Sequence, residues 1–353
     1  MSVTKVSSAM QDLTDDYAFS GTVSGAGAPS HRNDIINGGL VVNQENQTAP
    51  ADDAYTIGDL FLHVGEGTPV MSLETDGPQG TRPWQKMVLD ANDQGGLVYF
   101  MSNDDVQDYI ANGKLSFGIQ LKTTAATISN ARIGILKWVG TADAVTSDVV
   151  GTWASDGTNP TLATSWSYEN TPANIGLTTS FARHTVEDVT VDSNTKNIAI
   201  FVWTDDGTIT ASDVIGFSEW QCNPGATVHA FSSPSKDEVM NQVDYYLMRY
   251  SLNDNSFQTL AVGHQSTTTN AKLTMHLRRE MRNGGTVTSS AAATWTVHSG
   301  NVAAAPSSIV AFNALGRYGF NIDMTVASRT QGWAANLYRT SSSTTFIQMD
   351  SRL

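Results

Sequence analysis

The feature that most constrains this fold is a strict alternation of side chains along residues 113–122. Four apolar residues occupy every second position of this segment: Leu115, Phe117, Ile119 and Leu121. Small or polar residues stand between them: Ser116, Gly118 and Gln120. Because successive side chains of a β-strand point to opposite faces, the pattern predicts a strand with one face in a core. We therefore expect an antiparallel sheet with these four apolar side chains buried.

A second strand pattern, over residues 198–203, is apolar on both faces. Ile198, Ile200 and Val202 alternate with Ala199, Phe201 and Trp203. Such a strand belongs in the middle of a sandwich or carries a ligand-facing surface. Turn compositions interrupt the β pattern at residues 155–157 (S-D-G) and 205–207 (D-D-G). Together these patterns predict a jelly-roll β-sandwich over residues 33–234.

One helical pattern interrupts the strands. Ser235 and Glu238 form an S-x-x-E capping box. Apolar residues then recur at helical spacing: Val239, Val243, Tyr246 and Tyr250. We expect the longest helix over residues 235–250, linking two β domains. Alternation resumes afterwards, as in Leu273, Met275 and Leu277, and predicts a second, smaller β domain over residues 251–353.

The first 32 residues differ from the rest. Apolar residues follow a 3-4 spacing in Val3, Val6, Met10, Leu13 and Tyr17. Residues 21–30 are rich in Gly, Ser and Ala and are typical of a flexible linker. We interpret residues 1–32 as an attachment or oligomerisation segment with its linker. The alternative is a short amphipathic segment lying on another surface.

Composition narrows the class of protein. Charged residues make up 15% of the 353-residue chain, below the roughly 25% of a typical globular protein. Net charge of -14 argues against nucleic-acid binding, because nothing would neutralise phosphates. Cys222 is the single cysteine, so no intrachain disulfide is expected. No apolar run suits a signal peptide or a membrane span.

Catalytic signals are weak along the whole chain. It contains no G-x-S-x-G, H-E-x-x-H or C-x-x-C pattern. The densest acidic cluster is Asp104, Asp105 and Asp108, and adjacent carboxylates on a strand would face opposite sides. Hydrolysis of a glycoside needs two carboxyls facing each other across a groove. The sequence therefore predicts no enzyme, no catalytic site and no cofactor.

Aromatic residues concentrate in the middle of the predicted sandwich. Sugar recognition uses flat aromatic faces with amides or carboxylates beside them. The predicted glycan contacts are loop-associated: Trp153, Asp156, Trp166 and Tyr168. The competing interpretation is that these aromatic residues cap the core or line a subunit interface. Trp138 and Trp203 lie within strand patterns and are expected in the core.

Several short motifs fall in an order that resembles a known family. Asn33 and Asn37-Gly38 are followed by the turn at Val42 and Gln44 and by Tyr55-Thr56 with Asp59. Segment 113–122, the pair of segments 215–220 and 224–227, and segment 243–250 follow in order. The last of these is similar to the family's helix after the domain. This series resembles bacteriophage tail-fibre proteins that carry a carbohydrate-module-like jelly-roll domain.

The resemblance implies a virion structural protein that is assembled in the bacterial host cytoplasm. It implies a homotrimer, docked on other virion proteins through its N-terminal segment and displaying the jelly-roll for host-surface glycan recognition. A head fibre or capsid decoration protein is the alternative, and an exopolysaccharide-degrading enzyme is the second alternative. Modules of this kind often hold a structural Ca²⁺. No D-x-D-x-D loop is present here, and metal ligands are not assigned.

Overall fold

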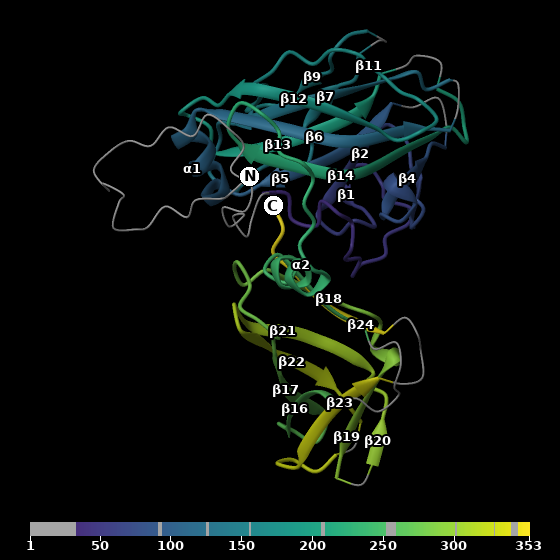
Figure 1. The fold of residues 1–353 in the computed structure, drawn as a ribbon. Helices are drawn as coiled ribbons and strands as arrows, with labels where there is room; N and C mark the ends of the chain where they lie inside the picture. The colour runs from purple at the N-terminus through teal and green to yellow at the C-terminus, as the bar shows by residue number, and fades with distance from the viewer. Residues whose placement is uncertain are drawn as a thin grey trace, which may run out of the picture.

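The computed structural model describes most of the chain as two β bodies joined by a short helix (Figure 1). The described residues are 33–90, 94–124, 127–154, 157–205, 209–251, 259–300, 302–327, 329–339 and 345–353. The predicted attachment segment, residues 1–32, lies outside them. We refer to the first body as the N-terminal body and to the second as the C-terminal body.

The N-terminal body is an antiparallel sandwich of two sheets. Sheet A has the order β1-β2-β5-β13-β7-β10, with β11 also paired to β7. Its strands are β1 (Ala54–Tyr55), β2 (Phe61–Gly65), β5 (Gly95–Met101), β7 (Asn130–Trp138), β10 (Trp166–Tyr168), β11 (Ile175–Gly176) and β13 (Asn197–Thr204). Sheet B has the order β12-β6-β14-β4-β3. Its strands are β3 (Val70–Glu74), β4 (Trp84–Val88), β6 (Lys114–Thr123), β12 (Ala182–Thr190) and β14 (Val214–Pro224). The predicted mainly β, antiparallel sandwich is confirmed.

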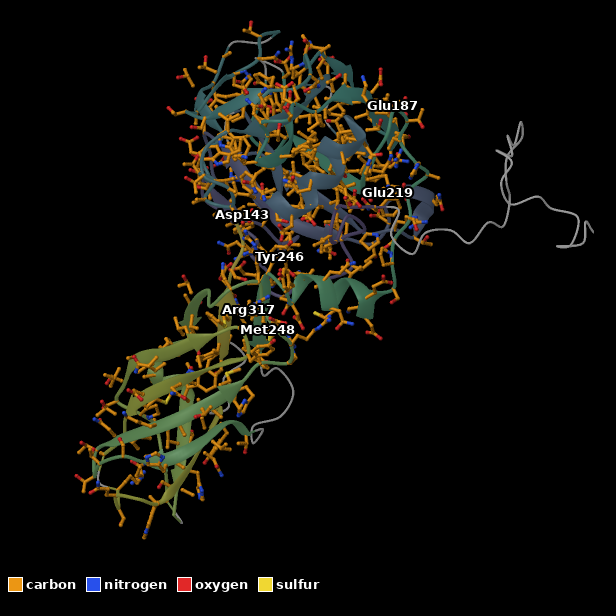
Figure 2. The ribbon with its side chains drawn as sticks, turned by 90° about the vertical axis from the view of Figure 1, so that its left-hand side faces the viewer. Asp143, Glu187, Glu219, Tyr246, Met248 and Arg317 are labelled. Atoms are coloured by element: carbon orange, nitrogen blue, oxygen red, sulfur yellow. The ribbon has the colours of Figure 1, made fainter. Side chains whose placement is uncertain are left out.

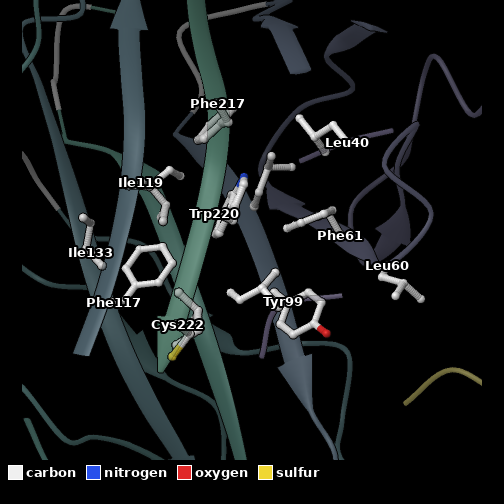
Figure 3. Close-up of a cluster of buried hydrophobic side chains, with 14 of the residues drawn as sticks. Leu40, Leu60, Phe61, Tyr99, Phe117, Ile119, Ile133, Phe217, Trp220 and Cys222 are labelled. Atoms are coloured by element: carbon white, nitrogen blue, oxygen red, sulfur yellow. The ribbon is translucent and has the colours of Figure 1, made fainter. Parts of the chain in front are cut away.

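The main core lies between these two sheets (Figure 3). All four alternating residues of β6 are fully buried in it, as the sequence predicts: Leu115, Phe117, Ile119 and Leu121. Trp220 of β14 lies against them, with its ring centroid 5.7 Å from that of Phe117. The same ring lies 4.9 Å from that of Phe61 on sheet A. Trp220 therefore ties the inner faces of both sheets together.

The outer face of sheet A carries a second apolar cluster. Phe201 and Trp203 of β13 stack there with centroids 4.5 Å apart, which explains why this strand is apolar on both faces. Segments 145–153 and 162–168 pack over them, and the ribbon of β8 (Val150–Thr152) and β9 (Thr161–Leu162) belongs to this layer. Trp138 and Trp203 are buried here, which confirms their expected place in a core.

Two α-helices occur in the described residues, and a serine is the N-cap of each. Helix α1 (Asn103–Asn112) has a complete capping box, in which Ser102 and Asp105 each bind the other's backbone N–H. The acidic cluster 104–108 thus lies on a helix and not on a strand or turn. Carboxylates in the first helical turn are stabilised by the unpaired backbone N–H groups and the helix dipole. Gly113, with φ 70°, ends α1 in the left-handed region.

Helix α2 (Lys236–Val243) is shorter than predicted. Ser235 is its N-cap, because its Oγ accepts a hydrogen bond from the Glu238 N–H at 3.3 Å. The helix has 8 residues against 10 in α1, so the predictions of a helix to residue 250 and of the longest helix are wrong. The chain turns and continues as β15 (Leu247–Ser251), which pairs with β24 (Phe346–Asp350). This tertiary pairing overrides the helical spacing of Tyr246 and Tyr250.

The C-terminal body is a second, smaller β-sandwich. Sheet C has the order β15-β24-β18, and sheet D has the order β20-β19-β23-β16-β17-β22-β21. The remaining strands are β16 (Thr259–Gln265), β17 (Asn270–His276), β18 (Thr286–Ser289), β19 (Trp295–Ser299), β20 (Val302–Ala304), β21 (Ser308–Gly316), β22 (Gly319–Thr325) and β23 (Ala334–Arg339). Its own core includes Trp295, Phe320 and Met349. The predicted fold class, with a second and smaller β part, is confirmed. This body includes β15 and Met248, so it begins before the predicted boundary at residue 251.

The two bodies are joined through β15 and a polar junction (Figure 2). Leu247 lies in the N-terminal core and the next residue, Met248, in the C-terminal core. Arg352, whose side chain is 4% exposed, pairs with Glu45 of the N-terminal body at 2.8 Å. Arg282 pairs with Asp143 at 2.8 Å. The bodies are therefore connected by a strand whose residues enter both cores and by ion pairs between the bodies.

We predict that Phe117→Ala lowers the free energy of unfolding by about 3 to 5 kcal/mol, because a buried ring is replaced by a cavity. Urea unfolding followed by tryptophan fluorescence measures this. Thr185→Ala, at an exposed position of the neighbouring strand β12, serves as control and should change stability by no more than about 0.5 kcal/mol. A small loss for Phe117→Ala would contradict its place in the core.

We predict that Arg352→Ala lowers the free energy of unfolding by about 3 to 5 kcal/mol, because it removes a buried cation on which the half-buried carboxylates of Glu45 and Asp350 converge. The matched control is Arg317→Ala. Arg317 pairs with Glu280 at 2.9 Å, but the two side chains are 45% and 38% exposed. That loss should stay near 0 to 1 kcal/mol, roughly the value of a surface pair. Equal losses in both variants would show that the junction charge contributes no special stability.

Candidate functional site

The residues predicted to contact glycan lie in the layer that covers sheet A. Trp166 is 6% exposed and packs between Trp138, at 5.1 Å, and Phe100, at 5.8 Å. Both neighbours take part in the apolar cluster, so the Trp166 ring offers little surface to a sugar. Trp166 therefore fits the competing interpretation, in which these aromatic residues cap the core.

The other predicted contacts are less enclosed. Trp153 is half-buried, with its ring edge-on to Phe201 at 6.0 Å. Tyr168 is half-buried and donates a hydrogen bond from its hydroxyl to the Pro160 carbonyl at 2.9 Å. Asp156 lies outside the described residues. A glycan contact at Trp153, Tyr168 or Asp156 stays a prediction.

A different groove emerges on the outer face of sheet B. The alternation that buries Leu121 turns its neighbours Gln120 and Lys122 outward, where both are half-buried. Lys122 is paired in register with Gly216 of β14, and Gly216 with Lys86 of β4. A Cβ on Gly216 would lie 2.8 Å from the Trp84 ring. The absence of a side chain at this position therefore lets the Trp84 indole lie against the sheet.

An aromatic and cationic cluster forms around that indole. The Lys122 ammonium lies 3.8 Å from the centre of the Trp84 ring and 4.6 Å from the centre of the Phe181 ring. The two rings meet edge to face at 5.6 Å. A cation over an aromatic face is attracted by the ring quadrupole, by about 0.5 to 2 kcal/mol. The rings therefore fix where the ammonium lies.

Asp76 holds the indole from its other edge. The Trp84 Nε1–H donates a hydrogen bond to Asp76 Oδ1 at 2.7 Å. This hydrogen bond lowers the pKa of the Asp76 carboxyl, with nearby Lys122 and Lys86 adding to the effect. The site thus contains a carboxylate, an ammonium and two rings in fixed relation.

A groove of about 450 Å³ opens beside Lys122. Its lining comes from the turn before β4, from β6 and from the segment before β12: Gly77, Pro78, Gln79, Gln120, Lys122, Thr179, Ser180 and Phe181. This lining combines an aromatic wall with two amides, two hydroxyls and an ammonium. Such a set can pack on an apolar ring face while donating to several oxygens. We name it the Lys122 groove.

The rest of the sheet B face is covered by the chain itself. Segment 225–234 returns across it after β14. The Asn223 amide accepts from the His229 N–H at 2.9 Å, and the Gln221 amide accepts from the Ser232 N–H at 3.4 Å. Arg82 lies over the Phe231 ring at 5.2 Å. This segment therefore closes one part of the face, and the Lys122 groove lies on the part that remains accessible.

A second groove, of about 480 Å³, lies between β11 and β12, and its lining includes three carboxylates: Glu169, Glu187 and Asp188. Each of these carboxylates has a hydrogen-bond or ion-pair partner within the protein. Glu169 accepts from the Asp192 N–H, Glu187 accepts from the Val228 N–H, and Asp188 pairs with Lys114. Asp205, the first residue of the predicted 205–207 turn, is buried and paired with Arg132 at 2.7 Å, and the rest of that turn lies outside the described residues. These contacts give the carboxylates structural partners.

Metal ligands are not gathered in the described ranges, where no three His, Cys, Asp or Glu side chains come together to hold a metal ion. Structural Ca²⁺ stays a prediction, because this cation also takes backbone carbonyl ligands. None of the helices in the described part of the chain is long and apolar enough to cross a membrane.

The sequence did not point to the Lys122 groove. Alternation turned Lys122 outward, but Trp84 and Phe181 lie far from it along the chain. Strand β14 separates β6 from β4 in sheet B. Only this strand order places the indole near Lys122.

The known proteins similar to this chain are solved structures, and their sequence identity to it is low. No protein-family model matches the chain, and no curated protein matches it. Among solved structures, it is similar to TmCBM61 in complex with β-1,4-galactotriose, at 12% identity and TM-score 0.32, covering 55% of this chain and 100% of that one. It is also similar to the CBM22-1 xylan-binding domain from Paenibacillus barcinonensis Xyn10C, at 10% identity and TM-score 0.29, covering 46% of this chain and 87% of that one. A third similarity is to a CBM4 structure, at 13% identity and TM-score 0.29, covering 54% and 98%. Similarities of this size assign no ligand to this chain.

Proposed function

We propose that this protein is a non-enzymatic glycan-recognition protein and that the Lys122 groove is its binding site. The observation that carries the proposal is the ammonium of Lys122, held 3.8 Å and 4.6 Å from two ring centres at the mouth of a groove lined with amides and hydroxyls. Glycans combine apolar C–H faces with dense oxygen atoms. The groove offers a complement to both.

Each wall has its own part in this function. Phe181 provides the apolar wall against which a pyranose face would pack. Gln79 and Gln120 provide amides for hydroxyl groups. Lys122 donates to hydroxyl oxygens and adds charge attraction when the glycan carries a carboxylate or sulfate. Glycans with acidic groups are therefore the favoured ligands of this groove.

We predict that Lys122→Ala and Phe181→Ala each weaken glycan binding by at least about tenfold. Lys122→Ala removes a charged hydrogen bond, which contributes roughly 1.5 to 3 kcal/mol, and Phe181→Ala removes the ring against which the pyranose face packs. A glycan array with purified protein identifies the ligand, and calorimetry measures the variants. Lys196→Ala removes one exposed charge from the end of sheet A and is the matched control. Binding that is equal in all three variants would exclude the Lys122 groove. Release of reducing ends from host polysaccharide would contradict the non-enzymatic proposal.

We further propose a virion setting of the tail-fibre type, as a homotrimer displaying this groove to the host surface. The motifs from Asn33 to segment 224–227 support it through their resemblance to that family, whereas segment 243–250 does not, because its second half is strand β15 and not a helix. The head fibre or capsid decoration protein is the alternative setting. In either, residues 1–32 would dock on another virion protein.

We predict that antibody-labelled particles carry this protein at the tail when examined by electron microscopy. Label on the head would favour the decoration alternative, and unlabelled particles would contradict both settings. A chain beginning at His31 should fold and keep its oligomeric state but fail to enter particles. Its normal incorporation would exclude the attachment role of the N-terminal segment.

A further inference from the structure

The C-terminal body carries a tryptophan that is 46% exposed, Trp333. It stands at the turn before β23, directly after Gly332, whose φ is 84°. Backbone hydrogen bonds tie this turn to the end of β16, since the Trp333 carbonyl accepts from the Gln265 N–H and the Gln265 carbonyl accepts from the Gly332 N–H, both at 2.8 Å. The backbone under the indole is therefore anchored.

The Trp333 indole packs against Gly300. A Cβ on Gly300 would lie 2.1 Å from the indole Cζ3 atom, so the ring packs directly on the glycine backbone. Gly300 also has φ 61°, which a side chain would strain. One side of the indole is thus seated on the β19–β20 turn, while much of the rest remains open to solvent.

A groove of about 500 Å³ lies beside this ring. It is lined by six residues: His298, Gly300, Gly332, Trp333, Ala334 and Asn336. The lining contains no carboxylate and no Lys or Arg. Its size falls within the roughly 300 to 1,000 Å³ of small-ligand sites. An aromatic platform with an amide and an imidazole at its edge is suited to an uncharged, hydroxyl-rich ligand.

Sheet D continues this surface away from the groove. His298 and Asn336 are register partners, and the row runs on through Val262. It then reaches Thr274, Asn321 and Asn313 on the next three strands. The members are exposed or half-buried, and the Thr274 hydroxyl donates to the Asn321 amide at 2.9 Å. At about 4.8 Å per strand, six strands give a row about 24 Å long.

We propose that Trp333 is the stacking platform of a second binding site, for a neutral saccharide. One pyranose ring packs on the indole while His298 and Asn336 bind its hydroxyls. Further sugar units follow the Asn and Thr row across sheet D. The site goes beyond the function proposed for the Lys122 groove, because it lies on the other body and takes an uncharged ligand. It stands on its own geometry and does not depend on that function.

The test uses the full chain and three neutral oligosaccharides: cellotetraose, mannotetraose and β-1,4-galactotriose. Saturation-transfer difference NMR detects binding, and calorimetry measures it. We expect at least one of the three to bind the unmodified chain. Trp333→Ala should weaken that binding by at least about tenfold, because the stacking surface is lost. Gly300→Ala should weaken it as well, because the new Cβ displaces the ring.

Two controls separate this site from the Lys122 groove and from stacking on any exposed ring. Tyr318→Ala removes another exposed aromatic residue of the same body, 65% exposed, and should leave binding unchanged. The Lys122→Ala and Phe181→Ala double variant should also keep it, so failure of one site is distinguishable from failure of the other. Circular dichroism checks that each variant is folded.

Three outcomes would overturn the proposal. One is the absence of binding to all three oligosaccharides, and another is binding that survives Trp333→Ala. The third is a change of oligomeric state in Trp333→Ala with sugar binding intact, which would assign the indole to a protein interface.

Discussion

The attachment of the C-terminal body to the N-terminal body depends on the polar junction around Gln44. Its Nε2–H group donates to the Leu247 carbonyl at 2.9 Å, and its Oε1 accepts from the Arg249 N–H at 3.0 Å. Asp59 holds the backbone of Gln44, accepting from its N–H at 2.7 Å. A single amide from the N-terminal body therefore satisfies two backbone groups of β15. Unpaired backbone groups are costly when buried, so this contact fixes how the second body is attached.

The first motifs of the series that resembles the tail-fibre family also act by binding backbone groups. Asn33 accepts from the Cys222 N–H at 3.0 Å and donates to the Trp220 carbonyl at 2.7 Å. Asn37 donates to the Val42 carbonyl at 2.8 Å and to the Gly58 carbonyl at 3.0 Å. A Cβ on Gly38 would meet the Trp220 carbonyl at 2.2 Å. Asn33 and Gly38 therefore join the arm before β1 to β14, and Asn37 holds the arm's own turns, so these motifs have a structural role.

The sequence predicted what local periodicity controls and failed where distant strands decide. Alternation identified the buried face of β6 and the strands of the C-terminal body. It could not separate the end of α2 from the start of β15, because Tyr246 and Tyr250 fit a helix equally well until β24 pairs with the segment. It also could not show that Trp166 is enclosed, since its partners Trp138 and Phe100 lie on other strands. The Trp84 and Lys122 contact needed the order of sheet B for the same reason.

Lys122 differs from the arginines of the junction in the partners of its charge. The chain has 20 Lys and Arg against 34 Asp and Glu, so cations are scarce. Arg278, Arg282 and Arg352 pair with carboxylates at the junction. Within the described residues, Lys122 instead has rings as its close neighbours and no carboxylate at ion-pair distance. Because aromatic faces hold an ammonium without neutralising it, its charge stays available to an oxygen ligand. In the proposed binding mode, this charge would act together with packing of the ligand against Phe181.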